Sequence, residues 1–287
     1  MKIKESRALS FIAVAVVYIF ATVAGVAVYL SLDLPVWLSL LIADIVPTAL
    51  TFIFSLIFSN ASVYDPYWSV QPIVIGVAFA IKYSLNALGI IALVAVCFWG
   101  VRLTANWAYT FKNLTHQDWR YTMLKEKTKA FYPVINFVGI HLVPTLVVYG
   151  CVLPVVYIIV LKPALNALSV VSLSISFLAV ILQGTADIQM HRFRKSGVGG
   201  FIRVGLWKYS RHPNYLGEIL MWWGIALCSL FALSKAWYLS FGAVANTILF
   251  LVVSIPMADG RQSRKEGYFE YKRETRMLLP VKKFVKK

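Results

Sequence analysis

The residues best suited to chemistry lie in one stretch, Gly205–Trp223, with the sequence GLWKYSRHPNYLGEILMWW. The stretch begins with polar residues, passes a proline and continues as an apolar helix that carries Glu218 in its second turn. Asn214 and Glu218 are four residues apart, so a helix places them on one face. A carboxylate close to hydrocarbon is unfavourable unless it has a partner, and we expect Arg211, His212 and Asn214 to supply partners. This crowding of donors, acceptors and aromatic rings favours a binding site over an isolated structural carboxylate.

A second pair of polar residues, Asp65 and Tyr67, lies in the segment SVYDPYWS at a predicted span boundary. A carboxylic acid and a phenol this close can hold or protonate a carbonyl oxygen, provided that burial raises the pKa of the carboxyl group. The alternative is a turn at the membrane interface, because Asp-Pro starts turns and Tyr and Trp favour the interface. The sequence leaves both interpretations open.

A basic helical face is predicted in the segment ADIQMHRFRKSG. Asp187, His191 and Arg194 recur there at spacings of four and three residues, which places them on one side of a helix. An arginine beside a bilayer can bind a phosphate group through two parallel hydrogen bonds. An ordinary cluster of cytoplasmic basic residues is the alternative.

The tail from Asp259 to Pro280 carries Arg261, Arg264, Tyr268 and Tyr271 ahead of a basic run. We predict a short amphipathic helix that folds back under the helical bundle. Such a helix either covers a ligand or lies on lipid headgroups.

The composition indicates what positions these residues. The chain of 287 residues is 60% hydrophobic and 14% charged, whereas about 25% of the residues of a soluble domain are charged. Several apolar runs reach the roughly 18 to 20 residues that a helix needs to span a bilayer. We predict an all-α, polytopic membrane protein, a single integral membrane domain over residues 1–287, with about eight transmembrane helices. The predicted spans are Ala8–Leu32, Val36–Phe58, Tyr67–Ile81, Ala87–Leu103, Phe131–Leu153, Ala164–Ala186, Asn214–Leu233 and Ala236–Pro256.

The fifth apolar run continues past Pro154 to Leu161. Residues 131–161 therefore form either one tilted or kinked helix, or a span followed by a return segment. Pro144 within the run suggests a kink, because proline removes a backbone donor from the helix.

The basic residues are distributed unevenly about these spans. With Met1 in the cytoplasm, all but three of the 28 Lys and Arg residues fall on the cytoplasmic side, the exceptions being Lys82, Lys162 and Lys235. This asymmetry predicts both termini in the cytoplasm and a cofactor cavity that opens there. It accounts for the net charge of +16 without a nucleic-acid partner, and membrane lipids are expected partners instead. We expect a multi-pass protein of a bacterial plasma membrane.

Metal chemistry is not predicted. The three cysteines, Cys97, Cys151 and Cys228, all lie in apolar runs, and the four histidines are widely spaced. His141 lies within a predicted span, where a hydrogen-bonded core histidine is the expected role.

Three segments taken together resemble a known family. The order ADxQxxxFRxxG, then GLWxYSRHPNYxGExxxWWG, then GYxEYxRxTxxxLP is similar to the DUF1295 branch of the steroid 5α-reductase C-terminal superfamily. The resemblance covers about residues 60–280. It implies a helical membrane reductase of seven to ten spans that binds NADPH in a cavity open to the cytoplasm. Such enzymes pass a hydride to the β-carbon of an enone, as in 3-oxo-Δ4-steroids.

The resemblance also implies roles for individual residues. Asn214 and Glu218 match the nicotinamide-contacting Asn and Glu of the family, and Asp187 and Arg194 match contacts to the ribose and phosphates. Arg261 and Arg264 fall where the family's tail contributes cofactor ligands. The remaining residues assigned to the cofactor site come from the same central block and are Tyr209, Arg211, His212 and Tyr215.

The catalytic pair does not follow from the motifs. The steroid enzymes carry a Gln-Glu pair in an early span and a later Tyr that hold the substrate ketone, and no such pair is recognisable here. Asp65 and Tyr67 are assigned to this role by their chemistry. The leading prediction is an NADPH-dependent reductase of a lipophilic enone that enters from the bilayer.

Two other functions stay open. Arg211, His212, Pro213 and Tyr215 also resemble the RHPxY element of isoprenylcysteine carboxyl methyltransferases, which use S-adenosylmethionine. Asn214 and Glu218 after this element favour the reductase. A lipid-binding or scaffold membrane protein without enzymatic activity is the third interpretation.

Overall fold

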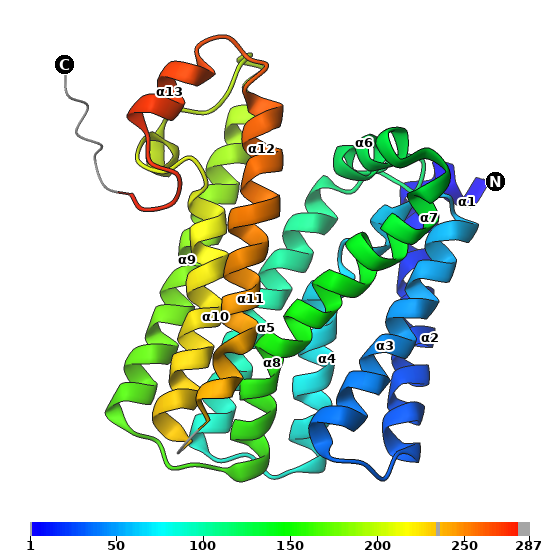
Figure 1. Cartoon of the computed structure of the whole chain (residues 1–287), viewed down its shortest axis with the longest axis vertical. Helices are drawn as coiled ribbons and strands as arrows, with labels where there is room; N and C mark the ends of the chain where they lie inside the picture. Colours follow the sequence, from blue (N-terminus) through cyan, green and yellow to red (C-terminus); the bar gives the residue numbers. More distant parts are fainter. Residues whose placement is uncertain (1, 234–235, 281–287) are drawn as a thin grey trace.

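The computed structural model describes residues 2–233 and 236–280, and every regular element within these ranges is a helix (Figure 1). Seven helices in the described residues are long and apolar enough to cross a membrane. The predicted all-α, polytopic membrane fold is confirmed. The α-helices are α1 (Lys2–Glu5), α2 (Arg7–Ser31), α3 (Val36–Ile57), α4 (Tyr67–Lys82), α5 (Ala87–Thr110), α6 (Trp119–Thr128), α7 (Tyr132–Ile135), α8 (Val143–Leu161), α9 (Ala167–Lys195), α10 (Pro213–Ala232), α11 (Phe241–Leu249), α12 (Ile255–Gln262) and α13 (Tyr268–Glu274).

Six shorter helical pieces connect or continue these helices. Four are 3-10 helices and two, η3 and η6, are π-helical. They are η1 (Ala61–Tyr64), η2 (Lys129–Phe131), η3 (Asn136–Leu142), η4 (Gly205–Lys208), η5 (Trp237–Ser240) and η6 (Phe250–Ser254).

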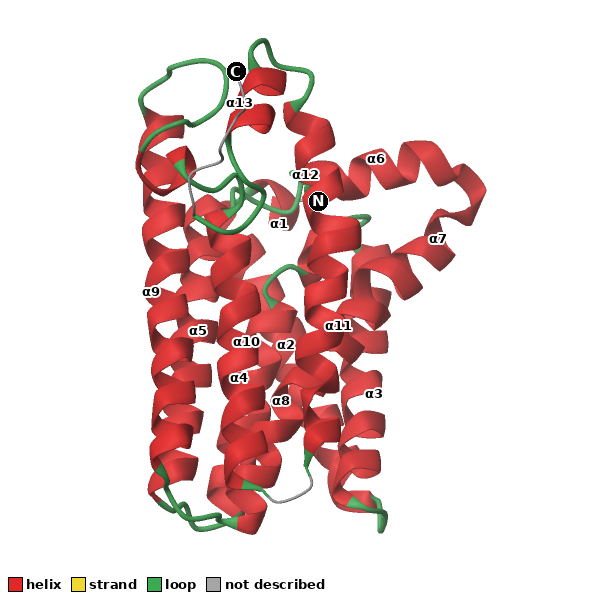
Figure 2. Cartoon of the chain, turned by 60° about the vertical axis from the view of Figure 1, so that its left-hand side comes forward, coloured by secondary structure: helices red, strands yellow, loops and turns green. Residues whose placement is uncertain are grey.

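Helix α4 makes the eighth passage through the bundle, although it has only 16 residues. Helices α1 and α13 lie at the same end of the bundle in both views (Figure 1, Figure 2). An even number of passages is needed to bring them there. Helix α4 ends at Lys82 and α8 ends next to Lys162, and both of these helix ends lie at the opposite end of the bundle (Figure 1), as the charge asymmetry predicted. Lys235 lies outside the described residues.

The fifth apolar run is one continuous helical path from Tyr132 to Leu161, formed by α7, η3 and α8. It contains no return segment. The path widens into the π-helical segment η3 directly before Pro144, and Val143 N–H bonds to the carbonyl of Val138, five residues back. A proline cannot donate this kind of bond itself, which explains why the irregular turn lies there.

Polar caps define where several spans begin. The Asn86 side chain accepts a hydrogen bond from Gly89 N–H (2.9 Å) at the start of α5, and Asn166 accepts one from Ser169 N–H (2.9 Å) at the start of α9. Such caps satisfy donors that a helix start leaves free. Helix α10 instead begins with Pro213 in its first turn, where no donor is needed.

Small residues let α10 lie against α9. A Cβ added to Gly217 would lie 2.7 Å from the carbonyl oxygen of Ala179, and one added to Gly224 would lie 2.2 Å from Ser176 Oγ. Close approach through small residues is the usual basis of helix association in membranes. The pairing fixes the rotation of α10 and therefore the direction in which Asn214 and Glu218 face.

Candidate functional site

Two connected chambers lie at the end of the bundle that carries α13. The outer chamber has a volume of about 1060 Å³ and is lined by the end of α9, residues 197–202, the start of α10 and the tail. The inner chamber has a volume of about 510 Å³ and extends between the membrane-spanning helices. Both volumes fit the size of ligand pockets, roughly 300–1,000 Å³. Residues that line both chambers form the junction; they include Asp65, Asn106, Asp118, Asp187, Asn214 and Tyr215.

Asn214 lies at the junction with an unused acceptor. Its Oδ1 is buried and has no hydrogen-bond partner among the described residues. The neighbouring Tyr215 is held in place by aromatic contacts. His212 stacks on its ring at a centroid distance of 5.3 Å, and Phe250 contacts the ring at 4.9 Å. The start of α10 therefore offers an amide oxygen to whatever occupies the junction.

Glu218 lies on the wall of the inner chamber, one turn deeper than Asn214, so the predicted common face is confirmed. It is 4% exposed and accepts hydrogen bonds from Trp99 Nε1 (2.8 Å), Gln183 Nε2 (2.9 Å) and Trp222 Nε1 (2.9 Å). The expectation that Arg211, His212 and Asn214 partner this carboxylate is wrong. Neutral donors from three helices satisfy it instead, because the start of α10 faces the tail.

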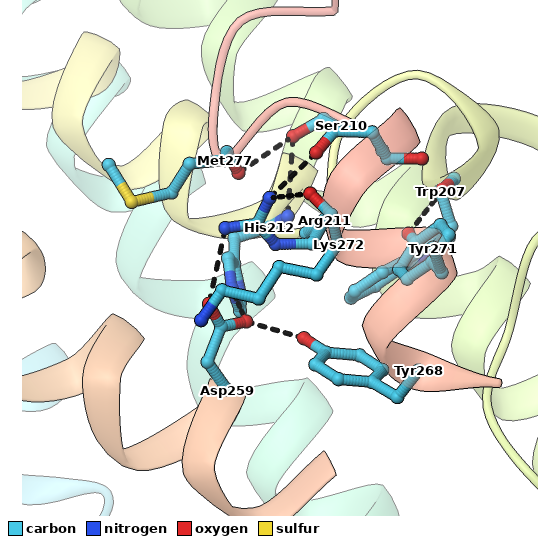
Figure 3. Close-up of polar contacts among 10 residues, drawn as sticks. Trp207, Ser210, Arg211, His212, Asp259, Tyr268, Tyr271, Lys272 and Met277 are labelled. Atoms are coloured by element: carbon cyan, nitrogen blue, oxygen red, sulfur yellow. Dashed lines mark hydrogen bonds and ion pairs between the residues drawn. The ribbon is translucent and has the colours of Figure 1, made fainter. Parts of the chain in front are cut away.

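Arg211 and His212 meet Asp259 of α12 (Figure 3). Arg211 Nη2 lies 3.2 Å from Asp259 Oδ2, and His212 Nε2 lies 2.9 Å from Oδ1. Tyr268 Oη also donates to Asp259 Oδ1, and Lys272 Nζ lies 3.4 Å from Oδ2. We call these five residues the tail cluster. It joins α10, α12 and α13 around one carboxylate.

The same cluster explains how the tail folds. Arg211 N–H donates to the carbonyl of Arg276 (3.0 Å), and Arg211 Nη1 donates to the carbonyl of Thr275 (2.6 Å). The predicted amphipathic tail helix is α13, which lies at the same end of the bundle as α1 (Figure 2). Tyr268 and Tyr271 line the outer chamber.

The predicted helical face of α9 is confirmed, since Asp187, His191 and Arg194 all line the outer chamber. Two partners come from α5. Arg102 Nη1 forms an ion pair with Asp187 (2.7 Å), and Asn106 Oδ1 lies 2.7 Å from His191 Nε2. Arg102 and Asn106 were not predicted as site residues, although their helical spacing is visible in VRLTANWAY.

Four exposed cationic residues line the outer chamber, and one of them, Lys265, donates from its Nζ to the carbonyl of Gly200 (2.6 Å). They are Arg194, Arg261, Arg264 and Lys265. The Arg261 guanidinium lies 4.5 Å from the ring centroid of Trp119. Partial burial and the charges of Arg261 and Arg194 lower the pKa of Lys265. Crowded like charges of this kind favour an anion between them. Tyr209, in contrast, is 48% exposed and lines neither chamber, so the structure does not bring it to the site.

Comparison with known proteins identifies the family of the chain. The family described as "Protein of unknown function (DUF1295)" matches residues 51–275. The chain belongs to the DUF1295 family. This is the steroid 5α-reductase-like family. An uncharacterized protein of Schizosaccharomyces pombe is 26% identical over 198 residues, which cover 57% of this chain and 56% of that protein. The chain thus matches little more than half the length of that curated relative. No solved structure matches the chain at a significant level.

In this DUF1295 protein Asp65 and Tyr67 do not form the predicted pair, because each has a different partner. Asp65 lines both chambers and accepts a hydrogen bond from Tyr121 Oη (2.7 Å). Burial raises the pKa of Asp65 to about 6 in spite of the nearby positive charge of Arg120. Tyr67 lines neither chamber; its Oη donates to Asp44 Oδ1 (3.0 Å) in the interior of the bundle.

Asp44 is a carboxylate that the sequence analysis missed. It is buried in α3 and also accepts a hydrogen bond from Gln71 Nε2 (2.5 Å). An ionisable residue within an apolar run is by itself a signal of a buried polar site. Between this pair and the inner chamber lies Tyr64, whose ring centroid is 5.3 Å from that of Tyr67. The chain therefore does contain a carboxylate in an early span that accepts a hydrogen bond from a tyrosine. The two residues are Asp44 and Tyr67, not Asp65 and Tyr67.

No group of three potential metal ligands occurs within the described ranges. His141 is fully buried in η3, and its Nδ1 lies 2.9 Å from the carbonyl oxygen of Asn136. This is the core position predicted for it.

Proposed function

We propose that this DUF1295 protein is an NADPH-dependent reductase of a lipophilic enone. The observation that carries the proposal is the joining of two unlike chambers at one point. The outer chamber is basic and lies at the α13 end of the bundle, whereas the inner chamber lies among apolar spanning helices. A charged dinucleotide and an apolar substrate can therefore meet at the junction.

The residues present fit NADPH. Arg194, Arg261, Arg264 and Lys265 would hold its phosphates, because guanidinium and ammonium groups are the usual phosphate partners. Asn214 Oδ1, which has no partner among the described residues, would accept a hydrogen bond from the nicotinamide carboxamide. When bound, NADPH supplies a hydride to the β-carbon of the enone.

The chain itself must polarise the carbonyl oxygen and provide a proton. Asp65 stays our candidate for this role, with Tyr121 as its partner in place of Tyr67. A raised pKa keeps part of the Asp65 population protonated near neutral pH, so that the acid can donate to an oxygen at the junction. Tyr64 and Tyr121 both line the inner chamber and are the phenols that could complete this contact. Tyr67 does not line the chamber and would contribute only by holding the ring of Tyr64 in position.

Thermal unfolding in detergent tests the cofactor first. NADPH at a hundredfold excess over its dissociation constant should stabilise the protein by about 2.7 kcal/mol. NADP+ should also stabilise it, and S-adenosylmethionine should not. Stabilisation by S-adenosylmethionine alone would replace the reductase by a methyltransferase, and no response to any of these ligands would favour a lipid-binding protein.

A charge-reversal pair on α9 makes the test specific to the outer chamber. Arg194→Glu should weaken NADPH binding at least tenfold, since Arg194 lines the chamber. Arg192→Glu is the matched control, because Arg192 is exposed on the same helix and does not line either chamber. Equal losses in both variants would mean that only the overall charge matters. Consumption of NADPH with a 3-oxo-Δ4-steroid then tests the reaction.

A further inference from the structure

The inner chamber ends where α8 and α11 cross. Gly150 and Gly242 meet there, and a Cβ added to Gly242 would lie 2.1 Å from the carbonyl carbon of Gly150. From this crossing the two helices diverge toward the α13 end (Figure 1). Residues of both helices line the inner chamber above the crossing. The crossing is therefore the closed end of the chamber, and the junction is its open end.

Both diverging paths are irregular at the chamber. The π-helical segment η3 precedes Pro144 on one side, and η6 precedes Pro256 on the other. Gly139 and Ile140 of η3 and Phe250 and Val253 of η6 line the chamber. Widened turns of this kind often mark functional sites, because they turn side chains away from the regular helical register.

Asn246 is a polar residue close to the crossing of α8 and α11. It lies one turn above Gly242 on α11, is 2% exposed and lines the inner chamber. Its Nδ2 has no hydrogen-bond partner in the part of the chain that the structure describes. The nearest chamber-lining residues on α11 and η6, Leu249 and Phe250, are apolar. A buried amide in such surroundings is unfavourable until an oxygen binds it.

The rotation of α11 is fixed by a contact on its other side. Trp223 Nε1 of α10 donates to Thr247 Oγ1 (2.9 Å), the residue next to Asn246. Thr247 does not line the chamber. Asn246 is thus held facing inward, and its amide can rotate to meet either a carbonyl or a hydroxyl group.

We infer that the inner chamber binds a lipophilic compound with two oxygen functions, one at each end. Asn246 binds the distal carbonyl or hydroxyl oxygen, and the reactive enone then lies at the junction. The inference rests on the proposed function, because that function assigns the inner chamber to the apolar substrate. It adds Asn246 as a specificity-determining residue of the protein. It also adds a second oxygen function to the proposed substrate.

A matched pair of steroid probes tests the inference. Progesterone carries an enone at one end and a ketone at the other, and its analogue with a methylene in place of the side-chain ketone lacks only the distal oxygen. Binding of the tritiated probes is measured on protein in nanodiscs without NADPH. The wild type should bind progesterone about tenfold more tightly than the analogue, the value for one buried hydrogen bond.

Asn246→Leu should bind both probes equally and should not unfold at a lower temperature, since leucine suits an apolar site. Asn246→Ala is the second variant in case leucine is not accommodated. Ile248→Ala is the control and should keep the preference for progesterone, because Ile248 is exposed on the same helix and does not line the chamber. Equal binding of both probes by the wild type, binding of neither, or a preference that survives in Asn246→Leu overturns the inference. NADPH-induced stabilisation, measured on the same samples, should persist in Asn246→Leu; its absence in the wild type would instead count against the proposed function.

Discussion

Glu218 and Asp259 are both buried carboxylates beside the cavity, but opposite kinds of partner surround them. Three neutral donors hold Glu218 within the membrane-spanning bundle. Asp259 lies among Arg211, His212 and Lys272 at the surface end, with Tyr268 as a neutral donor. Neutral donors satisfy a carboxylate where no counter-ion can be hydrated, whereas a cation cluster suits a site that borders water.

The two environments serve different purposes. The neutral donors of Glu218 come from α5, α9 and α10, so this carboxylate joins three spans and stabilises the wall of the inner chamber. The cations around Asp259 attach the tail to the start of α10 (Figure 3). One carboxylate therefore supports the bundle, and the other closes the outer chamber. Substitutions of Glu218 and of Asp259 should therefore differ in how much they lower stability and in how that loss depends on salt.

The largest effect is expected from Asp259→Ala. The substitution leaves the buried guanidinium of Arg211 without its carboxylate, a loss of about 3–5 kcal/mol for a broken buried pair. Thermal unfolding and limited proteolysis of the tail measure it. Glu270→Ala, at an exposed position of α13, is the control and should leave both readouts unchanged. A tail that stays protected in Asp259→Ala would show that the tail cluster does not hold it.

Glu218→Ala should have the next largest effect. Three buried donors lose their acceptor, and because water or side-chain movement satisfies part of them, a net loss of about 1–3 kcal/mol should remain. Glu218→Gln keeps one acceptor oxygen and should lose less. The loss in both variants should be the same at low and high salt, because the partners are neutral. A clear salt dependence of the unfolding temperature would contradict this interpretation.

Asp65, which lines both chambers, should give a pH dependence. Its folded pKa of about 6 lies above the ordinary value of 3.8, so the folded protein binds more protons than the unfolded chain between these pH values. Stability therefore falls as pH rises from about 4 to 6, by on the order of 2 kcal/mol. Asp65→Asn should remove this dependence, as measured by unfolding temperature at pH 4.5 and 7. The same slope in Asp65→Asn would assign it to another group.

The smallest effect is expected from Lys272→Ala. Lys272 is half exposed and lies 3.4 Å from Asp259, and exposed ion pairs contribute about 0–1 kcal/mol. The change in unfolding temperature should be small and should vanish at high salt. A loss as large as that of Asp259→Ala would mean that the lysine, rather than Arg211, holds the tail.

Local spacing predicted much of this molecule, whereas contacts between helices did not follow from it. The common face of Asn214 and Glu218 and that of Asp187, His191 and Arg194 depend only on helical periodicity. The bond from Trp99 to Glu218 joins residues 119 positions apart, and the pair of Arg102 with Asp187 spans 85. In a bilayer the lipid-facing and core-facing sides of a helix are both apolar, so the apolar pattern does not show which side faces inward. Because the facing of each helix could not be read from the sequence, Asp65 and Tyr67 were predicted to act together only on the basis of their closeness in the sequence.

The shortness of α4 has a consequence for the depth at which Asp65 lies in the membrane. Sixteen residues of helix extend about 24 Å, which is less than the roughly 30 Å of hydrocarbon in a bilayer. This hydrophobic mismatch either thins the membrane beside α4 or draws the helix end below the headgroups. Asp65, two residues before α4, then lies beneath the plane of the surrounding lipid surface. Under the proposed function, a water-soluble cofactor would reach down to that depth through the outer chamber, and a lipid substrate would reach it without leaving the bilayer.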